Sequence, residues 1–242
     1  MRRAGARSAM SLPVMRLALP FACMLVLGAS NLGCAGDPDD PPPGAPADAD
    51  ACDEAAPPTR TASCVNDFSA GEGAGYGMDR FPEVVFGEPL GGGASGGSLD
   101  VLSLGKGGEI VLGFGGNAIV DGEGVDFIVF ENAFYVQGDP DKVFKELGEV
   151  SVSADGAEWV TFSCRTDAYP HEGCAGWRAT FANPEAGVSA FDPEVAGGDP
   201  FDLAEVGLAE ARFVRIRDVS NFGAADTAGF DLDAVAIVNA AR

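Results

Sequence analysis

The sequence predicts an all-β protein, an antiparallel β-sandwich with one short helix. From Cys64 onward, short apolar runs are separated by Gly and Asp clusters, a texture typical of domains built from many short strands. Residues 211–217 and 229–238 alternate polar and apolar side chains, as strands with one buried face do. Between residues 151 and 162, Asp155-Gly156 separates two β-prone runs, which predicts a tight hairpin. One domain, residues 64–242, is long enough to bury a sizeable core.

The individual strands follow from the same alternation and from the turn residues between the runs. Residues 127–130 are apolar on both faces and therefore predict a central strand. Residues 201–207 predict the short helix, with Asp199 or Pro200 near its start. Trp159, just after the Asp155-Gly156 turn, is expected in the core. The predicted strands are residues 83–86, 99–104, 109–114, 125–130, 149–153, 158–163, 177–181, 213–217 and 230–238.

The first 33 residues have the pattern of a secretory signal peptide. Four arginines and no acid precede the apolar run 17–29. That run is shorter than the ~20 residues of a membrane-spanning helix. Asn31-Leu-Gly-Cys34 resembles a bacterial lipobox, although Asn31 stands where Leu is usual. The resemblance implies that Cys34 is lipidated and that the exported protein is a lipoprotein of the cell envelope, at the outer membrane or cell surface. It would then contact the membrane only through this anchor; ordinary cleavage nearby is the alternative.

A spacer is predicted behind Cys34. Residues 34–63 combine Pro, Ala and acids without an aromatic or β-branched cluster, so they are expected to form an extended, disordered linker. The remaining cysteines form an even set, as expected in an oxidising compartment. Pairing between near neighbours is preferred among three connectivities, and zinc is disfavoured because there is no C-x-x-C spacing and only one histidine. The preferred disulfides are Cys52 with Cys64 and Cys164 with Cys174.

The chain is strongly acidic, with a formal net charge of −22. Such a surface repels nucleic acid and anionic lipid and favours cations as partners. The simpler interpretation is that some of the acids only keep an exported protein soluble.

The acids near glycine turns predict a calcium site, because calcium takes six to eight hard oxygen ligands. Asp126 lies on the same face as Ile128 and Phe130, where a carboxylate needs a cation or several hydrogen-bond donors. Asp231 and Asp233 lie two apart on a predicted strand and share a face. The alternatives are hydrogen bonding to turn amides for Asp126 and a solvated hairpin tip for Asp121 and Glu123. The predicted calcium ligands are Asp121, Glu123, Asp126, Asp199, Asp231 and Asp233; Glu131-Asn132, Asp202 and Asp218 belong to the same set of acid-rich turns.

Three segments together resemble a known group. A strand-DG-x-x-W-strand hairpin at 151–162, the A-R-F-V-R-I-R segment at 211–217 and the acidic strand 229–238 resemble the galactose-binding-like jelly rolls, the discoidin and carbohydrate-binding-module type. The resemblance implies a binding protein without catalytic activity, and a structural calcium on the closing strand that singles out Asp233, with Asp231 second. The segments 73–82, 122–134 and 197–204 also resemble uncharacterised bacterial cell-surface proteins and lipoproteins, a similarity that covers nearly all of residues 64–242.

The expected ligand is a glycan or a cell-surface protein. Sugar binding uses aromatic ring faces beside polar groups, and the candidate contacts are Tyr76, Tyr135, Trp177 and Phe222. Trp177 is equally expected to pack on a disulfide.

No catalytic residue is predicted. The G-x-S-x-G match at residues 93–97 lacks the strand-to-helix context of a nucleophile elbow, and His171 lies in the predicted disulfide loop. Two alternatives to a binding module remain open. One is an enzyme that cleaves glycosides or polysaccharides with paired carboxylates. The other is a purely structural or adhesive protein-binding module.

Overall fold

The computed structural model describes residues 52–220 and 229–242. The predicted signal peptide, Cys34, most of the predicted linker and Phe222 lie outside the described residues. Among the described residues, no helix is both long and apolar enough to cross a membrane.

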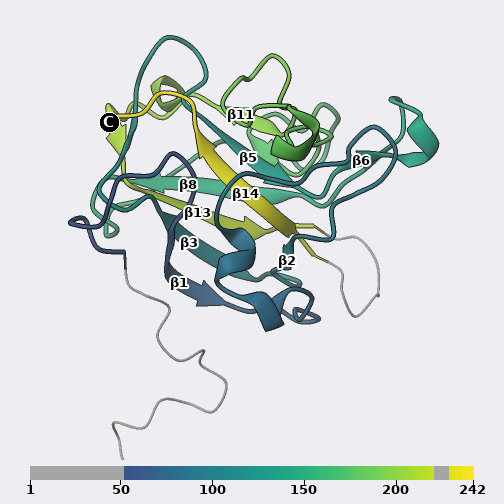
Figure 1. The fold of residues 1–242 in the computed structure, drawn as a ribbon, viewed down its shortest axis with the longest axis horizontal. Coiled ribbons are helices and arrows are strands. Elements are labelled where there is room, and N and C mark those ends of the chain that lie inside the picture. Colours follow the sequence, from purple (N-terminus) through teal and green to yellow (C-terminus); the bar gives the residue numbers. More distant parts are fainter. Residues whose placement is uncertain (1–51, 221–228) are drawn as a thin grey trace, which may run out of the picture. The chain divides into compact units, whose positions relative to one another are not determined.

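The domain is an antiparallel β-sandwich of two sheets, which confirms the predicted fold class (Figure 1). The order is β1-β3-β13-β8-β10 in the first sheet, with β9 paired to β8, and β11-β5-β14-β2 in the second. The first sheet consists of β1 (Cys64–Ser69), β3 (Glu109–Gly113), β13 (Phe213–Asp218), β8 (Gly148–Ser153), β10 (Cys174–Ala175) and β9 (Val160–Thr161). The second consists of β11 (Asp199–Phe201), β5 (Phe127–Glu131), β14 (Asp231–Ile237) and β2 (Leu102–Ser103). Two ribbons pair β4 (Ile119–Val120) with β12 (Glu210–Ala211) and β6 (Phe134–Tyr135) with β7 (Val143–Phe144).

The helical elements within the described ranges are single 3₁₀ turns: η1 (Met78–Arg80), η2 (Glu83–Val85), η3 (Val136–Gly138), η4 (Pro184–Ala186) and η5 (Leu203–Glu205). The helix predicted at 201–207 is the turn η5, and its N-cap is Asp202, whose side chain accepts the Ala204 N–H. The strand predicted at 83–86 is wrong. Pro82 has helical backbone angles, and the turn η2 that follows it still buries Val84 and Val85.

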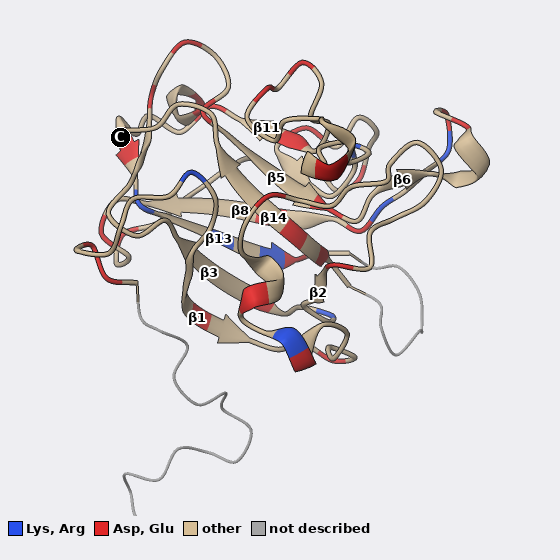
Figure 2. Cartoon of the chain, in the orientation of Figure 1, with Lys and Arg blue, Asp and Glu red and all other residues tan. Residues whose placement is uncertain are grey.

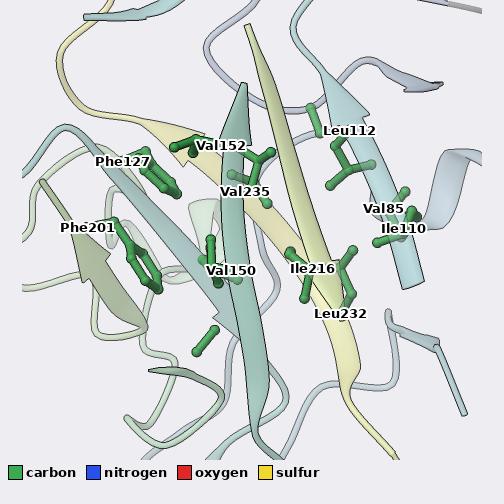
Figure 3. Close-up of a cluster of buried hydrophobic side chains, with 14 of the residues drawn as sticks. Val85, Ile110, Leu112, Phe127, Val150, Val152, Phe201, Ile216, Leu232 and Val235 are labelled. Carbon is green, nitrogen blue, oxygen red and sulfur yellow. The ribbon is translucent and has the colours of Figure 1, made fainter. Parts of the chain in front are cut away.

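The main core lies between the two sheets. Figure 3 shows Ile110, Leu112, Val150, Val152 and Ile216 of the first sheet facing Phe127, Phe201, Leu232 and Val235 of the second. These side chains are buried because alternate positions of each strand point to the same face. The hydrophobic free energy of this layer is the main contribution to stability.

The second sheet is covered on its outer face as well. Ile128 and Phe130 of β5 pack there with buried alanines from the segment 182–196. The prediction that residues 127–130 form a central strand is therefore confirmed: β5 lies between β11 and β14 and is buried on both faces. The strand predicted at 177–181 is wrong, since this segment contributes only an isolated bridge from Thr180 to Gly197.

The domain begins before Cys64. The disulfides are Cys52–Cys64 and Cys164–Cys174, as predicted. Thr59 N–H donates to the Phe114 carbonyl and Ala62 N–H to that of Val235, so residues 52–63 pack on the sandwich rather than extending the linker.

The hairpin around Asp155-Gly156 differs from its prediction in one respect. β8 and β9 pair across it, but residues 154–159 form a wider loop, in which Asp155 Oδ1 accepts the N–H groups of Ala157 and Glu158. Trp159 is half-buried rather than in the core, and the Arg215 guanidinium lies 4.5 Å from the centre of its ring.

Candidate metal centre

Acidic side chains meet at one end of the sandwich. Glu131 ends β5 and Asp231 begins β14, and the two strands are antiparallel neighbours, so both residues lie at the same end. Glu146 lies just before β8 of the opposite sheet. Carboxylate oxygens of Glu131, Glu146 and Asp231 all lie within 4.8 Å of one another. In Figure 2, acidic residues mark the start of β14 beside β2.

Glu131 is the most unusual member of this cluster. Strand alternation places it on the face of Phe127 and Val129, which belong to the core between the sheets. It has no exposed surface, and neither carboxylate oxygen has a hydrogen-bond partner. Burial raises the pKa of Glu131 well above its ordinary value, and the nearby charges of Asp231, Glu146 and Asp199 raise it further. A buried carboxylate without donors is costly unless a proton or a cation compensates it.

The two partners of Glu131 have perturbed pKa values too. Burial raises the pKa of Glu146 to about 7, although its Oε1 accepts the Gly229 N–H at 2.9 Å. Burial also raises the pKa of Asp231 to about 6, and its Oδ1 has no hydrogen-bond partner. Three carboxylates therefore share a water-poor space.

Two neutral oxygens adjoin the carboxylates. Ser103 lies opposite Asp231 in the β14–β2 ladder, and Asn132 N–H donates to the Asp231 carbonyl. Both side chains lie near enough to lower the pKa of Asp231, yet Ser103 Oγ and Asn132 Oδ1 are buried and unpartnered. Gly97 covers Asn132 so closely that a Cβ at residue 97 would lie 2.1 Å from Asn132 Oδ1. A side chain at residue 97 would therefore clash with the Asn132 amide unless that amide moved.

Basic side chains do not compensate the cluster. In residues 52–220 and 229–242, the Lys and Arg ion pairs involve other acids than Glu131, Glu146 and Asp231. A further acid stabilises the surrounding backbone: Asp218 accepts the Phe230 N–H through Oδ1 and the Gly107 N–H through Oδ2, both at 2.9 Å. The three carboxylates and two neutral oxygens are the hard donors that calcium takes, whereas zinc and copper sites use imidazole or thiolate.

Of the six predicted calcium ligands, only Asp231 belongs to this cluster. Asp126 lies at the opposite end of β5, and its prediction as a partner of Asp231 is wrong. Its carboxylate accepts N–H groups from Gly122 at 2.9 Å, Leu203 at 2.7 Å and the Asn239 amide at 2.8 Å. Asp126 is thus hydrogen-bonded to turn amides, which was the alternative interpretation.

Asp121 and Glu123 are exposed at the loop before β5, as the solvated alternative described. Carboxylate oxygens of Asp121, Asp126 and Asp202 lie within 4.8 Å of one another. Donors already occupy Asp126, and Asp202 caps η5. This second group therefore lacks the unpartnered buried oxygens of the first.

Asp233 and Asp199 are buried but do not belong to the cluster, although the charge of Asp199 raises the pKa of Glu131. Asp233 occupies the irregularity of β14 between Leu232 and Ala234, and its Oδ1 accepts the Leu90 N–H at 3.2 Å. Burial raises the pKa of Asp233 to about 7, and the charge of Asp100 adds to this shift. Asp199 Oδ2 accepts the N–H groups of Gly176 and Trp177.

Three of the four predicted aromatic contacts lie within the described residues, and each has different neighbours. Trp177 packs on the Cys164–Cys174 disulfide, and its indole N–H donates to the Cys174 carbonyl at 3.1 Å. Tyr135 is half-buried and contacts Phe181 edge to face, while Tyr76 is exposed and its hydroxyl donates to the Leu99 carbonyl.

Glu131 was named among the acid-rich turns but was not selected as a calcium ligand, and Glu146 was not named. Glu131 could have been selected by the argument applied to Asp126, because it ends the strand Phe127–Glu131, which is otherwise apolar. Glu146 carries no such signal, since it lies in the polar segment Lys145-Glu146 and reaches the site only because the two sheets pack against each other. No protein-family model matches the chain, and a search of curated proteins found no match, so the site stands on its geometry alone.

Proposed function

We propose that this domain is a calcium-stabilised β-sandwich whose role is to bind a partner rather than to catalyse a reaction. The ion is held by Glu131, Glu146 and Asp231, with Asn132 Oδ1 and Ser103 Oγ as neutral donors. The single observation that carries the proposal is Glu131, fully buried with two unpartnered oxygens among other acids. A divalent cation there replaces mutual repulsion by attraction and supplies the missing partners.

The geometry of the cluster favours an ion over a substrate. Two carboxylates with raised pKa values are also what a glycosidase needs, because one must stay protonated as the general acid. Glu131, however, has no exposed surface and Glu146 is 5% exposed. A sugar ring could not lie between them in this structure, whereas a single ion needs no such opening.

The proposal extends to the cellular setting. The basic and apolar amino terminus, the lipobox-like Cys34 and the acidic Pro-rich segment support export and lipid anchoring at the cell envelope. The resemblance of the hairpin and closing strand to galactose-binding-like domains supports a surface binding role, with a glycan or a surface protein as the partner. Mass analysis of the mature amino terminus tests the anchor: an unmodified chain cleaved elsewhere would contradict it.

Calorimetric titration tests the calcium site. After chelation, the protein is expected to bind one calcium ion in the cluster and to unfold at a higher temperature as free calcium increases, because a ligand that binds only the folded state stabilises it. Glu131→Gln keeps the shape of the side chain but removes a charged ligand, so calcium affinity should fall about tenfold or more, which corresponds to about 1.4 kcal/mol or more.

The matched control is Glu123→Gln, which makes the same chemical change on an exposed loop. It should bind calcium like the wild type. The calcium proposal is wrong if the chelated wild type takes up no ion, or if Glu131→Gln and Glu123→Gln bind calcium equally well.

A further inference from the structure

A pocket separate from the acidic cluster lies beside the Cys164–Cys174 loop. Its volume is about 410 Å³, and it is bounded by that loop, by β11 and by η5. The residues that give it its chemistry are Glu172, Trp177, Arg178, Asp199, Phe201 and Glu205. Asp199, which lines this pocket, raises the pKa of Glu131 through its charge, but it is not one of the three carboxylates of the cluster.

The pocket combines two buried aromatic residues with acids. Trp177 and Phe201 are buried, and so is Asp199, which is 1% exposed. Glu172 and Glu205 are exposed. Three carboxylates and one basic side chain therefore line a pocket whose accessible surface is mostly polar, with little of either aromatic ring exposed. A positive group that enters the pocket would meet the carboxylates.

Arg178 shows that the pocket accepts a cation. Its guanidinium lies 4.7 Å from the centre of the Trp177 ring, and its Nε lies 4.0 Å from Asp199 Oδ1. Asp199 Oδ2 accepts two backbone N–H groups, whereas Oδ1 is buried and has no hydrogen-bond partner. A half-exposed guanidinium at this distance compensates Asp199 only in part.

We propose that this pocket binds an organic ammonium group carried on a methylene chain, such as a lysine side chain of a protein partner or a free polyamine. This inference rests on the binding role proposed above and gives the chemistry of the partner, but it does not depend on calcium. The formal net charge of −22 favours the approach of cations. A neutral sugar would need a free aromatic face, and Arg178 occupies a face of Trp177.

Tryptophan fluorescence can report binding directly. The chain has two tryptophans, so Trp159→Phe leaves Trp177 as the only reporter. This protein is titrated at about pH 8 and physiological salt with spermidine, with Nα-acetyl-lysinamide and with 1,5-pentanediol, a neutral chain with similar apolar surface. Saturable binding of either amine without binding of the diol is expected. Tighter binding of the lysine derivative than of spermidine assigns the ammonium to a protein partner, and the reverse order assigns it to a free polyamine.

Two variants separate specific binding from general attraction to an acidic protein. Glu172→Gln with Glu205→Gln should weaken amine binding by about two- to fivefold, the range for exposed charge pairs. The control, Glu185→Gln with Glu194→Gln, removes the same charge from exposed acids outside the pocket and should bind like the parent. Equal weakening in both double variants would overturn the proposal, as would equal binding of the diol.

Arg178→Met gives a prediction of opposite sign. It removes the resident cation from Trp177 and Asp199 while keeping an apolar side chain, so amine binding should tighten by about threefold or more. If Arg178→Met weakened binding instead, the ligand would need the guanidinium, as an anion or a sugar does. That result would refute the ammonium site. Repeating the titration after chelation and in Glu131→Gln keeps the two proposals distinct, because amine binding should persist in both.

Discussion

The two ends of β5 carry buried acids with opposite surroundings. Asp126 precedes the strand and Glu131 ends it, about 17 Å away at the usual rise per residue. Both have no exposed surface. Three protein donors bind the Asp126 carboxylate, whereas the Glu131 carboxylate has no protein donor and lies among other acids.

The difference shows that burial alone does not identify a metal site. A buried carboxylate with enough donors joins separate segments: Asp126 links the loop at Gly122, the start of η5 at Leu203 and the chain at Asn239. A buried carboxylate without donors remains incomplete until it gains a proton or a cation. The supply of donors therefore separates a structural acid from a ligand.

The largest expected effect comes from Asp126→Ala. The substitution leaves the Leu203 N–H buried without an acceptor and removes two further charge-assisted bonds, so the free energy of unfolding should fall by about 3–4 kcal/mol. The loss should be the same with calcium and after chelation, as measured by urea denaturation. A loss seen only in the presence of calcium would instead make Asp126 a ligand. Asp121→Ala, on the exposed loop nearby, should change stability by less than about 0.5 kcal/mol.

The other end of β5 should respond to pH. Burial raises the pKa of Glu146 to about 7 and that of Asp231 to about 6, above their ordinary values of 4.5 and 3.8. In the calcium-free protein, the protonated forms of these two groups make their full contribution to the stability of the folded state below about pH 4. That contribution is lost as the pH rises through 6 to 7. Between about pH 5 and 8, the free energy of unfolding should therefore decrease by up to about 4 kcal/mol for these two groups together, at about 1.4 kcal/mol per pKa unit.

Calcium should reverse this trend, because its ligands must be deprotonated. The stabilisation by calcium is expected to grow over the same pH range, and urea denaturation at the two pH values with and without the ion measures both slopes. If calcium-free stability rose from about pH 5 to 8, the raised pKa values of the cluster would be refuted. A stabilisation by calcium that did not depend on pH would place the ion elsewhere.

The fold followed from the sequence where the pattern was local. Residues 213–218 alternate so regularly that the strand and its buried face could both be expected. Residues 109–113 and 231–237 were also expected as strands, but residues 232–237 are buried on both faces, and β14 has an irregularity between Leu232 and Ala234. The segments 83–86 and 177–181 look similar in sequence, but one follows Pro82 as a 3₁₀ turn, and the other lies along the outer face of a sheet. Tertiary packing overrides β-propensity at such positions.

The site was harder to predict because it depends on pairing between distant segments. Asp231 was expected as a ligand, since an acid on a closing strand is visible in the sequence. Glu146 meets it from the opposite sheet, where it lies just before β8 and its Oε1 accepts the N–H of Gly229, two residues before Asp231. The hydrogen-bond donors of Asp126 come from residues 122, 203 and 239, which no local pattern could reveal.

The smallest expected effect concerns Asp233, an acid that resembles Glu131 in burial but lies outside the cluster. One oxygen accepts the Leu90 N–H and the other has no partner, and burial raises the pKa of Asp233 to about 7. Asp233→Asn keeps an acceptor for Leu90 and removes the buried charge, so stability at about pH 7.5 should change by less than about 1 kcal/mol. Calcium affinity, measured by the same titration as for Glu131→Gln, should stay within about twofold of the wild type, because Asp233 is not a ligand. A tenfold loss of calcium affinity would instead place the ion at Asp233, the position that the resemblance to galactose-binding-like domains favours. It would also show that a proton, rather than calcium, compensates the buried carboxyl group of Glu131.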